Sequence, residues 1–144
     1  MTFPRLGLVT MALSILLFSG APAFAEVFSY KADLSGLSEV PPNDSKGSGA
    51  VDAAYDTGSK AFSWTITYSD LTGPAVAAHF HGPAAAGKNA PPVVPLSGDL
   101  SSPISGEATL TDAQATDLNA GHWYFNLHTA VHPSGEIRGQ LVKE

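Results

Sequence analysis

A regular alternation of apolar and polar residues constrains the fold of this chain more than any other feature. It is clearest in residues 62–69, where aromatic and branched apolar residues alternate with serine and threonine. Successive side chains of a β-strand point to opposite faces, so this pattern predicts a strand with one buried face. The sequence Asp-Thr-Gly-Ser at 56–59 predicts a turn that pairs this strand with residues 51–55 in a hairpin.

Weaker versions of the same pattern predict further strands. They are residues 27–34, 51–55, 76–81, 104–110, 122–128 and 136–142, with a short strand at 93–96 inside a proline-rich loop, 82–103. A helix is predicted at 112–120, because Thr111 and Gln114 have capping-box spacing and Gly121 would end it. Short strands with frequent Gly/Pro turns predict an all-β fold, a Greek-key β-sandwich or barrel with one short helix. The expected core contains Phe62, Trp64, Ile66, Trp123, Phe125 and Leu127.

The first 25 residues have the features of a secretory signal peptide. Arg5 precedes an apolar stretch at 6–18, and Ala23-Phe24-Ala25 forms a small-x-small cleavage pattern. The apolar stretch is shorter than the roughly 20 residues that a membrane-spanning helix needs. We therefore expect a mature domain of residues 26–144 in the periplasm or outside the cell, with no membrane attachment after cleavage.

Charge and sulfur content exclude several kinds of partner and site. Without Arg5 the chain keeps six basic residues against thirteen acidic ones, and no Lys/Arg cluster is present. Nucleic acid is therefore not an expected partner, because it requires concentrated positive charge. The chain has no cysteine, and Met1 and Met11 both lie in the predicted signal peptide, so no sulfur ligand is expected in the mature domain. No feature of the sequence points to a particular oligomeric state.

Five histidines carry the chemical signal of the sequence. His79 and His81 form a His-x-His pair on a predicted strand, and residues two apart on a strand share a face. His128 lies on the polar face of a later strand, and His132 follows after a turn that would fold it back. If the strands are neighbours, these four imidazoles could converge on one ion. His122 would lie about 20 Å from His128, at ~3.3 Å per residue, and is expected on the surface.

A His-x-His pair is weak support by itself, because histidines at strand ends are often surface residues. Four histidines on two predicted polar faces favour a metal site, since imidazole is the commonest metal ligand. Nitrogen-only ligation fits Cu(II) or Zn(II), whereas Ca²⁺ and Mg²⁺ prefer oxygen. The Irving–Williams order favours copper, with zinc as the alternative, and the lack of cysteine excludes a blue-copper site.

Short motifs run in order along the chain. They are Leu34-Ser35-Gly36, Glu39-Val40-Pro41-Pro42, residues 77–84 around the His-x-His pair, Leu110-Thr111, residues 121–129, and Pro133-Ser134-Gly135-Glu136-Ile137-Arg138-Gly139-Gln140-Leu141. In these motifs, which cover nearly all of residues 26–144, the chain resembles the CHRD (chordin-type) domain of many secreted bacterial proteins. This resemblance implies nothing about catalysis.

The histidine layout has a second, weaker resemblance, to copper–zinc superoxide dismutase. That resemblance implies that His79, His81, His128 and His132 hold copper and that Arg138, the only arginine after residue 25, guides superoxide. No histidine follows in the loop after His81 and no disulfide can form, which implies a copper-only centre. Two functions are therefore expected: a copper-dependent dismutase-type enzyme, or a non-catalytic module that binds or sequesters copper or acts in adhesion.

Overall fold

The elements of the protein are nearly all β-strands. The computed structural model describes residues 24–144, so the predicted signal peptide, apart from Phe24 and Ala25, lies outside the described residues. The strands are β1 (Val27–Ser35), β2 (Ser48–Asp56), β3 (Ala61–Ser69), β4 (Ala75–His81), β5 (Pro92–Pro95), β6 (Ile104–Thr109), β7 (Tyr124–Thr129), β8 (Ile137–Gln140) and β9 (Val142–Lys143). A 3₁₀ turn, η1 (Gly36–Ser38), and one α-helix, α1 (Asp112–Asn119), complete the described chain.

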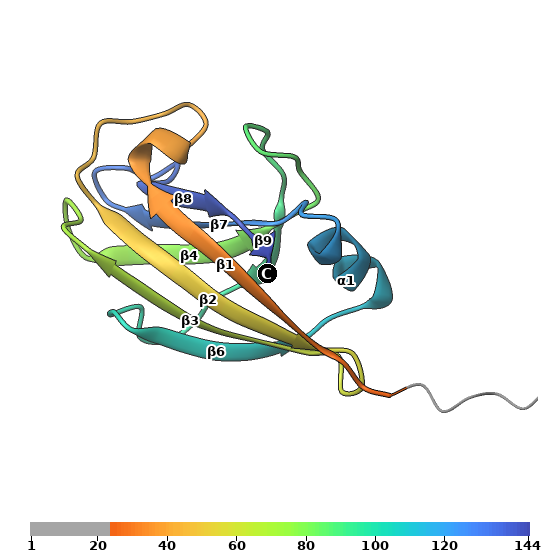
Figure 1. Ribbon diagram of the computed structural model, residues 1–144. Coiled ribbons are helices and arrows are strands. Elements are labelled where there is room, and N and C mark those ends of the chain that lie inside the picture. Colours follow the sequence, from red (N-terminus) through yellow and green to blue (C-terminus); the bar gives the residue numbers. More distant parts are fainter. Residues whose placement is uncertain (1–23) are drawn as a thin grey trace, which may run out of the picture.

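All strands pair antiparallel in one sheet that bends into a nearly closed barrel. The order is β5-β4-β7-β8-β1-β2-β3-β6, with β9 beside β1. In Figure 1, β1, β2, β3 and β6 form one layer, and β4, β7 and β8 lie behind it. The chain crosses between the layers after β3, after β5 and again after β6, because β4 pairs with β5 and β7 while β6 pairs with β3. The predicted all-β barrel or sandwich is confirmed.

The core lies between the two layers. The ring of Phe62 on β3 meets Phe80 on β4 at 5.1 Å and Trp123 at 5.5 Å, both edge to face. All six residues expected in the core are buried, as the alternation predicted. Burial of a large apolar side chain stabilises a fold by roughly 1.5–3 kcal/mol, so these aromatic contacts hold the layers together.

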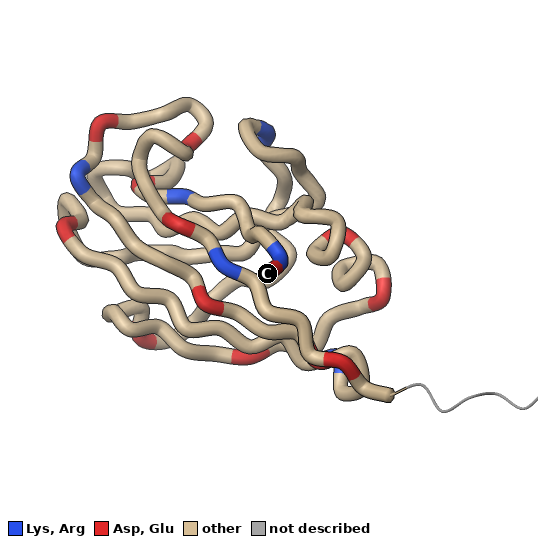
Figure 2. The backbone as a smooth tube through the Cα atoms, in the orientation of Figure 1, with Lys and Arg blue, Asp and Glu red and all other residues tan. Residues whose placement is uncertain are grey.

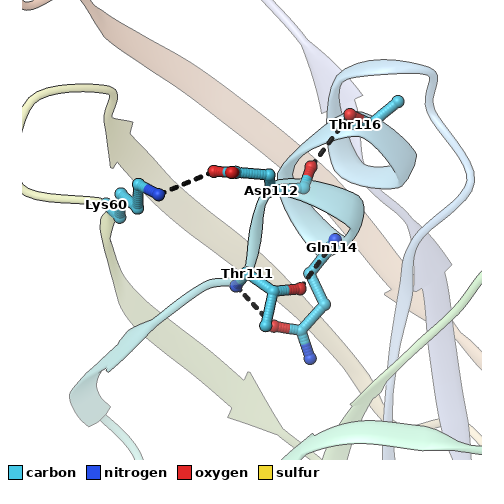
Figure 3. A network of polar contacts seen from close by, with 5 residues as sticks. All are labelled: Lys60, Thr111, Asp112, Gln114 and Thr116. Atoms are coloured by element: carbon cyan, nitrogen blue, oxygen red, sulfur yellow. Dashed lines mark hydrogen bonds and ion pairs between the residues drawn. The ribbon is translucent and has the colours of Figure 1, made fainter.

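The single helix begins with the predicted capping box. Thr111 Oγ1 accepts a hydrogen bond from the Gln114 backbone N–H, and the Gln114 side chain accepts one from the Thr111 N–H (Figure 3). Lys60 also forms an ion pair of 2.8 Å with Asp112 at the start of the helix. Leu118 and Ala115 are buried, so α1 covers one end of the barrel.

Two predicted strands differ from the observed ones. The predicted strand 122–128 begins at Tyr124, because the His122 carbonyl accepts a hydrogen bond from Ala84 N in the loop after β4. The predicted strand 136–142 divides into β8 and β9, and between them Leu141 N donates to the Trp123 carbonyl in register with the β7–β8 pairs. The hairpin β2–β3 and the short strand β5 agree with the predictions.

The described surface has no concentrated charge. In residues 24–144 the basic residues are spread over several strands and loops and alternate with acidic ones (Figure 2). Within the same residues, no helix is long and apolar enough to cross a membrane.

Candidate metal centre

Three adjacent strands present a polar outer face opposite the core. In β4, β7 and β8 the core-facing residues, among them Phe80 and Phe125, alternate with polar ones. The register aligns His79 with Asn126 and Asn126 with Arg138. The next row aligns His81, Tyr124 and Gln140. We call the seven residues His79, His81, Tyr124, Asn126, His128, Arg138 and Gln140 the outer face.

A loop shields much of this face from solvent. Residues 82–91, which we call the covering loop, connect β4 to β5 and contact the outer face through backbone carbonyls. Ala90 O accepts hydrogen bonds from His81 Nδ1 and from the Tyr124 hydroxyl. Consequently Tyr124 and Asn126 are buried although they point away from the core. A strand pattern could not predict this burial, because it depends on a loop that returns over the sheet.

Three of the four predicted metal ligands lie together. One ring nitrogen of each of His79, His81 and His128 falls within 4.8 Å of the other two. His79 Nδ1 and His128 Nε2 are 3.2 Å apart. Two nitrogens that share one ion at about 2.0–2.1 Å lie about 2.9–3.4 Å apart for coordination angles of roughly 90–110°. The spacing of this pair therefore suits a shared metal ion.

Two of the imidazoles are oriented by backbone carbonyls. His81 Nδ1 donates to Ala90 O at 2.9 Å, and His128 Nδ1 donates to Pro133 O at 3.0 Å. A carbonyl oxygen can only accept, so both Nδ1 atoms carry a proton, and in the neutral rings both Nε2 atoms keep a lone pair. Metal-binding histidines commonly have this arrangement, in which the second ring nitrogen is held by an acceptor.

The surroundings favour neutral imidazoles. Burial is the main cause that lowers the pKa of His79, with smaller contributions from the neighbouring His128 and His81. Burial also lowers the pKa of His81, and the carbonyl of Ala90 and the side-chain oxygen of Asn126, which both favour the protonated ring, only partly oppose this. Neutral imidazole is the form that binds metals, so these shifts help the group bind an ion at neutral pH.

The structure does not bring the fourth predicted ligand, His132, into the group. In the described part of the chain the metal-type cluster contains only the three histidines above. His132 lies in the turn after β7, where its N–H donates to Thr129 Oγ1 and its carbonyl accepts from Gly135 N. His122 is exposed at the other end of β7, as the sequence predicted.

Arg138 lies on the same face as the histidines but is held in place. Its guanidinium stacks 3.4 Å from the centre of the Tyr124 ring. The strand register places Tyr124 beside His81, and these two rings stack with their centres 4.6 Å apart. Arg138 also donates to Asn89 Oδ1 and to Lys88 O in the covering loop. Its positive charge is one of the causes that lower the pKa of His81, so its electrostatic influence reaches the histidine group.

Two residues beside the histidines were not predicted from the sequence. Asn126 Oδ1 lies 2.8 Å from His81 Nε2 and 3.0 Å from His128 Nε2. Glu39 is buried, and burial raises its pKa to about 7, although the charge of Arg138 acts against the shift. Glu39 Oε1 has no hydrogen-bond partner. The i+2 spacing of Asn126 and His128 signals their shared face, whereas the approach of Glu39 depends on the loop after β1.

A pocket of about 490 Å³ adjoins this end of the outer face. Its lining includes Glu39, Val40, Pro42, Ala86, Arg138 and Gln140. Asn89 Nδ2 donates to Val40 O at 3.2 Å and so links the covering loop to the loop after β1. The pocket therefore lies between two loops, one strand away from Asn126 and Tyr124.

Comparison with known proteins identifies the family. The family model of the CHRD domain matches residues 30–141, which include every strand from β1 to β8 except the first residues of β1. No curated protein and no solved structure matches the chain, so the similarity to superoxide dismutase remains one of histidine layout. From the family match and the motifs, this chain belongs to the CHRD domain family.

Proposed function

We propose that this protein binds one copper ion, as Cu(II), through His79, His81 and His128 in the periplasm or outside the cell. The observation that carries the proposal is the convergence of three ring nitrogens within 4.8 Å. The carbonyl contacts of His81 and His128 support it, because they keep both Nε2 lone pairs available. Cu(II) is preferred to Zn(II) because nitrogen ligands bind copper more tightly in the Irving–Williams order.

Titration with Cu(II) followed by electron paramagnetic resonance tests this proposal. The expected result is one ion per chain with hyperfine structure from three nitrogens. His79→Ala and His128→Ala should each lower the affinity by about 100-fold, since each removes a ligand, whereas the exposed His122→Ala should not change it. A signal without nitrogen hyperfine structure would contradict copper binding at this group. Competition with Zn(II) in the same titration measures the preference between the two metals.

We further propose that the copper form dismutes superoxide. Copper held by these histidines would supply the one-electron redox chemistry by which one superoxide ion is oxidised to dioxygen and a second, with two protons, is reduced to hydrogen peroxide. Residues 26–144 carry excess negative charge, so fast reaction with an anion requires a local positive charge near the metal. Arg138 is the cation whose charge acts on His81.

The second candidate is a non-catalytic module that sequesters copper or acts in adhesion. It is favoured by the contacts of Arg138, whose guanidinium already binds Asn89 and Lys88 and covers Tyr124. Superoxide turnover and copper content of the wild type and of Arg138→Lys separate the candidates. The dismutase predicts turnover in the wild type and about tenfold less in the variant at equal copper content. A fully loaded wild type without turnover would leave the sequestering or adhesion module.

A further inference from the structure

We propose that Asn126 Oδ1 is the fourth ligand of the metal, which makes the centre a site with three nitrogens and one oxygen. This inference rests on the proposed metal binding by His79, His81 and His128. It arises from the hydrogen-bonding chemistry of the group. Oδ1 is in contact with Nε2 of His81 and of His128, and in the neutral rings neither nitrogen has a proton to donate, because the proton lies on Nδ1.

His81 shows the conflict most clearly. Its Nδ1 proton is committed to Ala90 O at 2.9 Å, so a neutral ring has only a lone pair on Nε2. That lone pair points at Asn126 Oδ1 from 2.8 Å, and an amide oxygen is an acceptor only. Two acceptors at this distance repel each other unless a cation lies between them.

His128 repeats the arrangement from the neighbouring position on β7. Its Nδ1 proton is committed to Pro133 O, and its Nε2 is 3.0 Å from the same Asn126 oxygen. His79 Nδ1 approaches this Nε2 from the other side at 3.2 Å. Three acceptor atoms therefore meet beside His79 Nδ1, which can supply at most one proton to them when the imidazoles are neutral.

Three successive contacts join the four candidate ligand atoms. Going from His79 to His128, Asn126 and His81, successive contacts are 3.2, 3.0 and 2.8 Å. Ligands at right angles around an ion at about 2.0 Å are about 2.8 Å apart, and tetrahedral ones are about 3.3 Å apart. The Asn126 contacts are closer to the right-angle value, and a tetragonal set of nitrogen and oxygen ligands is characteristic of Cu(II).

Glu39 lies on the other side of the amide and favours this orientation of Asn126. A Cβ atom on Gly135 would meet both Glu39 Oε1 and Asn126 Nδ2, so these two atoms border the same glycine. Glu39 Oε1 is buried without a hydrogen-bond partner, and an amide N–H₂ turned toward it leaves Oδ1 toward the histidines. The reversed amide would donate to Nε2 of His81 or His128 and would have to be displaced by the ion.

Electron paramagnetic resonance in H₂¹⁷O, on the full chain loaded with Cu(II), tests whether Asn126 or water occupies the fourth equatorial position. If Asn126 is a ligand, the wild-type resonance shows three nitrogens and no broadening from an equatorial H₂¹⁷O. Asn126→Leu should open an equatorial position, so ¹⁷O broadening should appear and the affinity for Cu(II) should fall about 10- to 100-fold. Asn126→Asp keeps an oxygen donor and should show wild-type behaviour without broadening.

Each outcome decides the inference. Equatorial ¹⁷O broadening already present in the wild type overturns it, because water then occupies the position assigned to Asn126, and this measurement needs no variant to fold. Broadening in Asn126→Asp equal to that in Asn126→Leu also overturns it. Absence of three-nitrogen hyperfine structure in the wild type is a different result, since it contradicts the proposed histidine site itself.

Discussion

Two buried polar clusters in this protein differ in how well their hydrogen bonds are satisfied. Around Glu136, both carboxylate oxygens receive donors: Ser45 Oγ and Thr72 N bond to Oε1, and Thr72 Oγ1 and Thr129 Oγ1 bond to Oε2. Around Asn126, the lone pairs of His81 and His128 face an acceptor oxygen instead. The first cluster is complete within the protein, whereas the second lacks a positive charge or a proton.

This difference separates a structural cluster from a ligand site. A satisfied buried carboxylate joins segments that are distant in sequence, here the loops before β2 and β4 and the ends of β7 and β8. A cluster of facing acceptors costs free energy in the empty protein and recovers it when a cation binds. Counting donors and acceptors is therefore more informative here than counting charged residues.

The largest effect should come from breaking the satisfied cluster. Glu136→Leu removes the carboxylate that accepts from Ser45, Thr72 and Thr129, and we expect the free energy of unfolding to fall by about 3–5 kcal/mol. Urea unfolding measures this. The matched control is Glu107→Leu on the exposed surface of β6, which should change stability by less than about 0.5 kcal/mol. Similar losses in both variants would contradict the role of Glu136.

Acid should weaken the same cluster over a defined range. Burial alone would raise the pKa of Glu136, but the hydrogen bonds from Thr129, Ser45 and Thr72 lower it from 4.5 to about 2. Because the folded-state pKa is lowered, the stabilisation is complete above pH 4.5 and is lost as pH falls toward 2, by up to about 3 kcal/mol. Unfolding curves between pH 4.5 and 2 test this. Glu136→Gln should lack the part of the pH dependence that comes from titration of this carboxyl. If the free energy of unfolding depends on pH equally in both proteins, Glu136 is not the source of the acid sensitivity.

Copper should stabilise the second cluster and leave the first unchanged. At free Cu(II) of 100 times Kd, the wild type should gain about 2.7 kcal/mol, and removal of copper with a chelator should reverse the gain. His79→Ala should lose most of the gain, while its metal-free stability falls by no more than about 1 kcal/mol. Thermal unfolding with and without copper measures both quantities. A full copper gain in His79→Ala would show that the ion binds elsewhere.

The smallest effect is expected at His132, which the sequence predicted as a ligand. Because the described cluster does not include it, His132→Ala should change copper affinity by less than about threefold and stability by less than about 0.5 kcal/mol. Isothermal titration calorimetry measures the affinity, with His122→Ala as the matched exposed control. A loss comparable to that of His79→Ala would make His132, and not Asn126, the fourth ligand.

The sequence by itself determined the strands and the side of each strand that enters the core. Period-two alternation is a local property, and burial of an apolar face follows from it whatever the partner strand is. For this reason Phe62, Trp123 and Phe125 are buried as expected, and His79 and His81 share the opposite face. The capping box at Thr111 is also local, and the helix begins there.

Only the tertiary structure decided which polar residues meet. The pairing of β4 with β7 and of β7 with β8 places His79 beside Asn126 and Asn126 beside Arg138, although these residues come from three separate segments. The covering loop then supplies the carbonyl at Ala90 that orients His81, and the turn after β7 supplies Pro133 for His128 while leaving His132 outside the group. Strand order and loop return depend on contacts between distant segments, which a local pattern of residues does not encode.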